Sequence, residues 1–330
     1  MTLKELSAAT GISMATISRI LNGSTRAGDD KLRILEEAIA ASGDQKLQSK
    51  FESATQERKI IALVVPDITN PFFTDVLDGI RSVLRPCGYE IIIMDSEEDV
   101  QKEIDILCTL KQLKLSGVII TPTSDAEEGL QCENLLKELR VPVILVDRDV
   151  RNSSFDGVFV HNELGAYNGV TELIRRGHRN IGLIAGPYSS KPGRERQNGY
   201  VNALTDAQIP VEPRYMMPGD FSRKSGFDLT LRLLDTCPEV TAIFSSNNLM
   251  TIGCLQALNQ RGLTPDVQVA VVGFDEVAQL MEQDPGITVV QRPTSEMGQA
   301  AAKIILDKCG SKGYASNRRI TLIPGLLRKK

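Results

Sequence analysis

Apolar residues recur every three or four positions at the start of the chain, which is the spacing of an amphipathic helix. Leu3, Leu6 and Ala9 fall on one face of this helix. Thr2 and Glu5 form a capping box, in which a hydroxyl and a carboxylate satisfy the free amide groups of a helix start. The pattern therefore predicts a helix that begins directly after Thr2.

Two further helices follow at close spacing. Gly11 is expected to end the first helix, because glycine adopts left-handed dihedrals at little cost, and Ser13 is expected to cap the second. A third helix begins at about Asp30 and ends before Gly43. Residues 1–43 are therefore predicted to form a helix-turn-helix unit with a third supporting helix.

The next segment, residues 44–59, is mostly polar or charged. Leu47 and Phe51 are its only large apolar residues. Such a sparse apolar pattern is typical of a connection rather than of a packed element. We therefore expect a linker or hinge between the head and a second domain.

From Ile60 the pattern changes to short apolar runs separated by amphipathic stretches. Continuous β-branched runs of this length are typical of strands that are covered on both faces. The expected strands are residues 60–65, 90–94, 117–121, 143–146, 157–160, 181–185, 242–244 and 267–272. The helices between them predict right-handed crossovers, and hence a doubly wound α/β domain.

The α/β domain, residues 60–330, is long for a single sheet. We therefore expect two lobes, each built on its own parallel sheet. Open α/β sheets bind ligands beyond the carboxyl ends of their strands. A ligand cleft between the two lobes is the expected result.

Composition and charge narrow the class of protein. Of the 330 residues, 42% are hydrophobic and 24% are charged, which is typical of a globular protein with a substantial core. A net charge of −4 excludes a chain that is basic throughout. Residues 1–28 carry a small local excess of +2, which allows modest attraction to phosphate. With no apolar block at the N-terminus, we expect a cytoplasmic protein without membrane contact.

The cysteines and histidines form no pattern that indicates catalysis or metal binding. The six cysteines are scattered without Cys-x-x-Cys spacing, so reduced, packed thiols are expected. His161 is interpreted as a capping or surface residue, and His178 as part of a structural turn. Glycine-rich phosphate loops and the Gly-x-Ser-x-Gly elbow are missing. We therefore expect no catalytic residue, no metal and no cofactor, although an α/β enzyme remains the alternative class.

The second helix carries side chains that suit DNA, and in a helix-turn-helix this helix enters the major groove. Arg19 can pair with guanine, whereas Met14 and Ala15 can contact a thymine methyl group. Three small hydroxyl residues suit phosphate contacts: Ser13, Thr16 and Ser18. The spacing alone fits an ordinary helical hairpin equally well.

The start of the chain closely resembles the DNA-binding head of the lactose/galactose-repressor family, in the run TLKELSAATGISMATISRILNG over residues 2–23. The resemblance implies a repressor that binds pseudo-palindromic operator DNA as a homodimer. It also implies that Met14 and Ala15 choose operator base pairs and that Arg19 reads a further base. The residues that would hold phosphates are Thr2, Ser13, Thr16, Ser18 and Asn22.

One segment departs from the family pattern. The family follows its third helix with Tyr-x-Pro-Asn-x-x-Ala-x-x-Leu, a hinge helix whose leucine opens the minor groove. This chain has GDQKLQSKFES over residues 43–53 instead, without proline and with acidic residues. Leu47 and Phe51 are the candidates for the wedge, and a less strongly bent operator is the alternative.

Residues 60–327 resemble the ribose-type periplasmic binding proteins and the matching domain of these repressors. The resemblance places lobe 1 at about 60–160 and 292–322, and lobe 2 at about 161–291 and 323–330. It implies an effector pocket of polar side chains flanked by aromatic rings. The expected members are Asn70, Phe72, Phe73, Asp147, Arg148, Arg196, Phe221, Asn247, Asp275 and Gln291.

Carboxylate, guanidinium and amide groups beside aromatic faces are the groups that recognise a polyol. The expected effector is therefore a small sugar, ribose or a similar monosaccharide. A nucleobase or nucleoside is the alternative, because other members of the family bind bases. For Phe72 and Phe73, simple core packing is an equal alternative to ring stacking. A transport-type binding protein is not expected, given the DNA-binding head.

Overall fold

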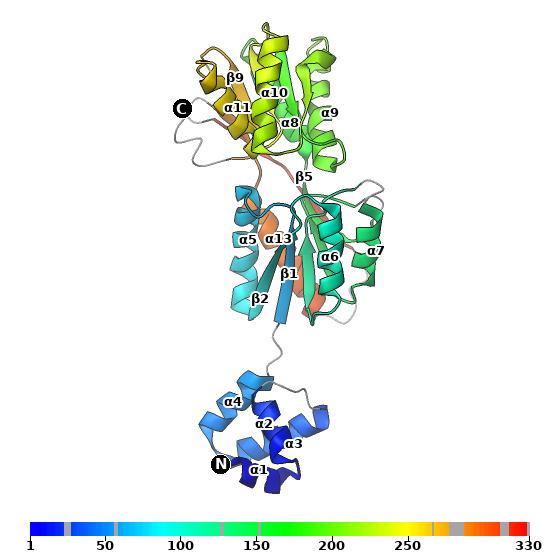
Figure 1. Ribbon diagram of the computed structural model, residues 1–330, viewed down its shortest axis with the longest axis vertical. Helices are drawn as coiled ribbons and strands as arrows, with labels where there is room; N and C mark the ends of the chain where they lie inside the picture. Colours follow the sequence, from blue (N-terminus) through cyan, green and yellow to red (C-terminus); the bar gives the residue numbers. More distant parts are fainter. Residues whose placement is uncertain are drawn as a thin grey trace. The chain divides into compact units, whose positions relative to one another are not determined.

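The chain folds as two separate units, Met1–Arg58 and Lys59–Lys330, in the computed structural model (Figure 1). The structure describes residues 1–22, 28–55, 59–125, 129–150, 153–265, 267–276, 287–310 and 317–328. Arg26, which contributes to the expected positive charge of the head, lies outside these ranges. None of the helices in these ranges combines the length and the apolarity that a membrane span requires.

The described part of the head contains four helices packed around one apolar core. They are α1 (Leu3–Thr10), α2 (Met14–Leu21), α3 (Asp29–Ser42) and α4 (Gln45–Thr55). The expected capping box is present, since the Glu5 amide donates to the Thr2 hydroxyl and the Thr2 amide donates to the Glu5 carboxylate. Gly11 ends α1 with a φ of 70°, in the left-handed region. The tight turn between α1 and α2 therefore forms as the sequence predicts.

Helix α4 contradicts the expected linker over residues 44–59. Phe51 is only 4% exposed and packs in the same core as Leu6 and Ile17 of the first two helices. Asp44 begins the helix by accepting a hydrogen bond from the Leu47 amide, at 3.1 Å. Leu47 and Phe51 are four residues apart and so lie on the same face of the helix. Two apolar residues are therefore enough to pack this segment against the head core.

The described part of the second unit contains two six-stranded sheets with the same strand order. The first has the order β11-β5-β4-β3-β1-β2, in which all neighbouring strands are parallel. Its strands are β1 (Lys59–Val65), β2 (Tyr89–Asp95), β3 (Gly117–Ile120), β4 (Val143–Val146), β5 (Asp156–Val160) and β11 (Arg319–Leu322). The second has the order β12-β10-β9-β8-β6-β7 and is parallel except for β12. Its strands are β6 (Ile181–Ala185), β7 (Met216–Pro218), β8 (Ala242–Ser245), β9 (Ala270–Phe274), β10 (Thr288–Gln291) and β12 (Gly325–Arg328).

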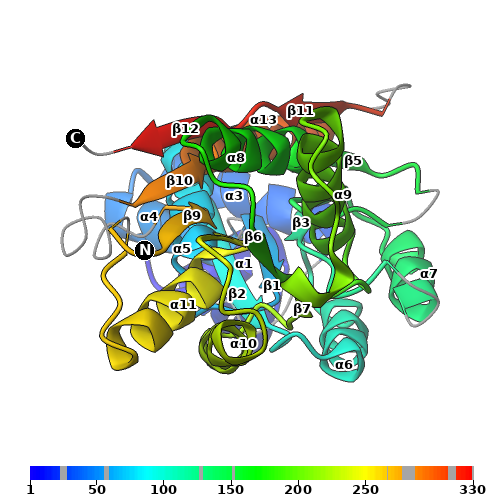
Figure 2. The same ribbon diagram turned by 90° about the horizontal axis from the view of Figure 1, so that it is seen from above.

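Helices cover both faces of each sheet. The first sheet packs against α5 (Pro71–Leu84) and α13 (Thr294–Gly310) on one face, and against α6 (Val100–Leu110) and α7 (Leu130–Glu138) on the other. The second packs against α8 (Asn162–Arg175) and α9 (Lys191–Asp206), and against α10 (Arg223–Thr236) and α11 (Asn248–Gln260) (Figure 2). Two short 3-10 helices, η1 (Arg85–Cys87) and η3 (Pro213–Tyr215), complete the described elements. The inner strands β3, β4, β5, β6, β8 and β9 are buried throughout, which explains their continuous apolar runs, whereas the edge strands β2, β11 and β12 are partly exposed.

The chain crosses between the two sheets after β5, after β10 and between β11 and β12. Two lobes result, each with the carboxyl ends of its parallel strands available for a ligand site. One expected strand is displaced: the run 267–272 was predicted, whereas β9 is Ala270–Phe274 and Val267 is 79% exposed. The apolar character of Val267 is misleading because it precedes the strand, in a turn.

Candidate functional site

Helix α2 separates its residues into a buried apolar face and an accessible polar face. Ile17, Ile20 and Leu21 lie in the head core. The residues expected to contact DNA are all exposed or half-buried: Thr2, Ser13, Met14, Ala15, Thr16, Ser18, Arg19 and Asn22. The head therefore presents this expected set to a partner without disturbing its core.

The start of α2 is organised by its own side chains. The Ser13 hydroxyl accepts a hydrogen bond from the Thr16 amide at 3.3 Å and shares a second with the Thr16 hydroxyl at 2.8 Å. Met14 follows at the first helical position with 50% of its surface exposed. The positive end of the helix dipole and small hydroxyls suit phosphate, while the exposed thioether offers an apolar contact.

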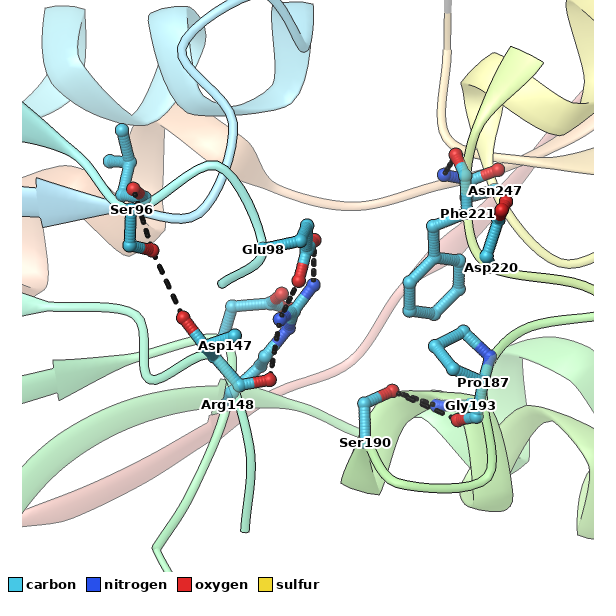
Figure 3. Close-up of polar contacts among 12 residues, drawn as sticks. Ser96, Glu98, Asp147, Arg148, Pro187, Ser190, Gly193, Asp220, Phe221 and Asn247 are labelled. Atoms are coloured by element: carbon cyan, nitrogen blue, oxygen red, sulfur yellow. Dashed lines mark hydrogen bonds and ion pairs between the residues drawn. The ribbon is translucent and has the colours of Figure 1, made fainter. Parts of the chain in front are cut away.

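A second candidate site lies between the two lobes of the second unit. It is a cavity of about 30 Å³ at the carboxyl ends of the strands. Its lining residues are Asn70, Phe72, Phe73, Glu98, Asp147, Arg148, Pro192, Arg196, Phe221, Asn247, Asp275 and Arg292. The structure thus brings together all the expected effector residues except Gln291. Figure 3 shows Glu98 and Arg148 on one side of this region, with Phe221 and Asn247 on the other.

Three of the lining residues have left-handed backbone conformations that non-glycine residues rarely adopt. The φ angles are 65° at Asp147, 70° at Phe221 and 74° at Asp275. Such conformations cost free energy and tend to cluster at ligand and active sites. At Asp147 and Asp275, they occur directly after β4 and β9, where the chain turns a carboxylate toward the cavity.

Arg292 joins two carboxylates of the cavity. Its guanidinium forms ion pairs with Asp147 and with both carboxylate oxygens of Asp275, one of them at 2.6 Å. It also lies over the ring of Phe72, 3.5 Å from the centroid. Burial lowers the pKa of Arg292, but the two carboxylates raise it more, so the pKa exceeds its ordinary value. The group is therefore a permanent buried cation.

Arg148 and Arg196 add two further buried guanidinium groups. Arg148 forms a bidentate pair with Glu98, at 2.6 and 2.7 Å, while its Nε is buried without a hydrogen-bond partner. Arg196 donates to the Asn162 side chain at 2.8 and 3.0 Å and to the Ser246 carbonyl oxygen at 2.6 Å. Burial and the repulsion of Arg292 lower the pKa of Arg196 to about 10, so the group stays protonated at neutral pH.

The amide residues of the cavity are held in defined orientations. Asn70 caps α5 and accepts a hydrogen bond from the Asn248 side chain at 2.8 Å, which joins the two lobes. Asn247 caps α11 and donates to the Phe221 carbonyl oxygen at 2.9 Å. Phe72 and Phe73 line the cavity and also pack in the first lobe's core, so ring contact and core packing coexist.

Gln291 does not line the cavity, contrary to the expectation from the sequence. It is exposed, and its side chain donates to Glu276 at 2.6 Å instead of facing the cavity. Gln291 pairs with Gly325 of β12, and the next residue, Arg292, turns inward. Arg292, Glu98 and Pro192 are the lining residues that sequence reasoning missed. Arg292 could have been found from its position, because it directly follows the expected residue Gln291 at the end of β10.

The two histidines each take part in a hydrogen bond. His161 caps α8 by accepting a hydrogen bond from the Leu164 amide, as its position after a strand predicts. His178 shares a hydrogen bond with Thr241 at 3.0 Å. The six cysteines form no disulfide, but the expectation of packed thiols holds only in part, since Cys132, Cys237 and Cys254 are buried whereas Cys87 and Cys108 are exposed. Across the ranges that the structure describes, no cluster of three His, Cys, Asp or Glu side chains is arranged to hold a metal.

A helix-turn-helix head joined to a two-lobed α/β domain with a polar interlobe cavity defines a class of DNA-binding regulators that respond to small molecules. Residues 1–44 match the helix-turn-helix family, and residues 58–329 match the periplasmic binding proteins and sugar-binding domain of the LacI family. The chain belongs to the LacI family of transcriptional regulators.

Relatives span nearly the whole chain. The HTH-type transcriptional repressor PurR of Photorhabdus laumondii is 26% identical over 313 residues, covering 94% of this chain and 91% of the relative. The transcriptional regulator CelR in complex with cellobiose has a TM-score of 0.74 at 26% identity, covering 99% of this chain and 98% of that structure. A LacI-family regulator of Enterococcus faecium with bound ribose has a TM-score of 0.71 at 25% identity, covering 82% and 97%.

Proposed function

We propose that this DNA-binding transcriptional repressor of the LacI family is controlled by a small sugar, ribose or a similar monosaccharide, bound between its lobes. The observation that carries the proposal is the chemistry of the interlobe cavity. Buried carboxylates, guanidinium groups and amides surround it beside three phenylalanine rings. Adjacent hydroxyls of a sugar can donate to the carboxylates and accept from the guanidinium groups, while the ring lies on an aromatic face.

Two solved relatives support a carbohydrate effector. One is described with cellobiose and the other with bound ribose, and their similarity covers the domain that holds this cavity. The buried charges also favour a sugar, because a site that hydrogen-bonds hydroxyl groups discriminates strongly against ligands that lack them. A nucleobase is the competing effector, and the acid, arginine and amide combination favours the sugar.

On the DNA side, the accessible face of α2 is the proposed reader. Met14 and Ala15 would contact base edges, Arg19 would pair with guanine, and the small hydroxyl residues would hold phosphates. We propose that two heads of a homodimer bind a pseudo-palindromic operator. Effector binding changes lobe geometry and thereby the affinity for that operator, as linkage between two sites requires.

Selection from a random duplex pool would give the operator, and gel shift of the full-length protein would then test its control. The titration would include ribose, other pentoses, hexoses, nucleobases and nucleosides. A change in operator affinity with a sugar supports the proposal, and a change with nucleobases alone favours the competing effector. Failure to bind any duplex more tightly than random DNA at low salt would refute the repressor assignment.

A further inference from the structure

Arg292 occupies the interlobe cavity in the manner of a ligand. Its planar guanidinium lies on the face of Phe72, 3.5 Å from the ring centroid, and is 6% exposed. Its N–H groups donate to Asp147 on one side and to Asp275 on the other. A sugar in this cavity needs the same aromatic face for its ring and the same two carboxylates for its hydroxyls.

The carboxylates that Arg292 joins belong to different lobes. Asp147 follows β4 of the first sheet, whereas Asp275 follows β9 of the second. Arg292 itself follows β10, at a point where the chain crosses from the second sheet to α13 of the first lobe. One buried cation therefore links the inner surfaces of both lobes through ion pairs.

The space that remains around this cation is too small for an effector. The cavity measures about 30 Å³, whereas pockets for small molecules have volumes of about 300 Å³ or more. A volume of this size accommodates about one water molecule. In this arrangement of the lobes, a monosaccharide can replace the contacts to both carboxylates only if the Arg292 guanidinium moves away.

We propose that Arg292 is an internal ligand of the effector pocket, which holds the two lobes together and competes directly with the effector. This inference rests on the proposed function in one respect, the assumption that the competing effector is a sugar. Arg292 sets specificity as well as affinity. A successful competitor must satisfy two carboxylates at once, so it must present several hydrogen-bond donors rather than an anionic group.

Arg292→Gln tests the internal ligand in the full-length protein. Removing the bridge is expected to increase the radius of gyration measured by small-angle X-ray scattering without added sugar. The same variant is expected to bind neutral monosaccharides about tenfold more tightly in calorimetric titration. This factor follows if the Arg292 guanidinium leaves the pocket free in about one-tenth of wild-type molecules, because the apparent affinity falls with that fraction.

Two arginine variants serve as controls. Arg261→Gln removes a surface ion pair with Asp235 and should change neither measurement. Arg194→Gln breaks another interlobe pair, with Asp125, but frees neither carboxylate of the cavity. Because the Arg292 bridge stays in place, this second variant should show the wild-type radius of gyration and sugar affinity, which separates the loss of any interlobe ion pair from the loss of the internal ligand.

The outcomes are distinct. An unchanged radius of gyration in Arg292→Gln, or lobe opening with unchanged sugar affinity, overturns the internal-ligand proposal. Lobe opening with no sugar binding by either protein leaves the bridge supported and refutes the sugar assignment. If Arg292→Gln does not give the wild-type circular dichroism spectrum, the same measurements are made on Arg292→Lys. The single ammonium group of lysine cannot donate to both carboxylates as the planar guanidinium does. Smaller changes in the same direction are then expected.

Discussion

Buried charge is the most demanding feature of the interlobe cavity at the level of single residues. Arg148, Arg196 and Arg292 are each almost completely buried, as are Asp147 and Asp275. A buried ion is stable only where partners replace its water, and removing one partner leaves the other uncompensated. This arrangement is costly for folding alone, which is why we assign it to ligand binding.

Replacing Arg196 or Asp275 by alanine should abolish the response to sugar while operator binding persists. Each change removes hydrogen-bonding groups from the cavity, and neither residue lies in the head unit. We expect at least a tenfold loss of sugar affinity, about 1.4 kcal/mol, by calorimetry. Arg261→Ala is the control, since its side chain pairs with Asp235 at the surface. A normal sugar response in both cavity variants would show that the effector site is elsewhere.

Arg19→Ala should reduce specific DNA binding far more than binding to random DNA. A guanine contact is worth about 1 to 3 kcal/mol of discrimination, whereas a phosphate contact affects all sequences alike. Lys4→Ala is the matched control, because it removes an exposed charge of the same head. Competition gel shifts at a single salt concentration would measure both affinities. Equal losses on the two DNAs in Arg19→Ala would argue against base recognition.

At the level of elements, α4 changes the picture of how the head connects to the rest of the chain. From the sequence, Leu47 and Phe51 are candidates for a wedge in the minor groove. In the structure both side chains belong to the head core. A residue that packs in the core cannot reach into a groove without unpacking, so α4 acts first as a structural part of the head.

Phe51→Ala should therefore destabilise the head strongly. Removing a buried phenylalanine costs about 3 to 5 kcal/mol, because apolar contacts are lost and a cavity remains. Scanning calorimetry of the full chain would detect a lower first transition, if the two units melt separately. Lys50→Ala, at an exposed position of the same helix, should change stability by less than about 0.5 kcal/mol. Equal effects of the two variants would indicate that α4 is a linker after all.

For the whole molecule, the division into two units determines what a ligand can stabilise. A ligand that binds only the native state raises stability by mass action, by about 2.7 kcal/mol at a hundredfold excess over its Kd. The effector cavity lies entirely within Lys59–Lys330. A pentose should therefore raise the melting temperature of that unit and leave the transition of the head unchanged. Arg196→Ala should lose this shift, and stabilisation of the variant by the same sugar would contradict the assigned pocket.

Much of the fold follows from local patterns in the chain. The capping box at Thr2, the glycine turn at Gly11 and the continuous apolar runs of the inner strands depend only on neighbouring residues. Such signals act over a few positions, so sequence reasoning can identify them. The expected cavity residues that directly follow a strand can be identified in the same way, because the carboxyl ends of parallel strands lie at one edge of a sheet.

The tertiary structure decided what depends on distant partners. Phe51 is a core residue only because α1 and α2 provide the other half of its packing. Gln291 pairs with Gly325 of β12, a strand from the end of the chain, and it is the next residue, Arg292, that lines the cavity. A shift of one residue at a strand reverses the direction of a side chain. Local sequence therefore determined where a polar site forms, and long-range pairing determined which cation fills it.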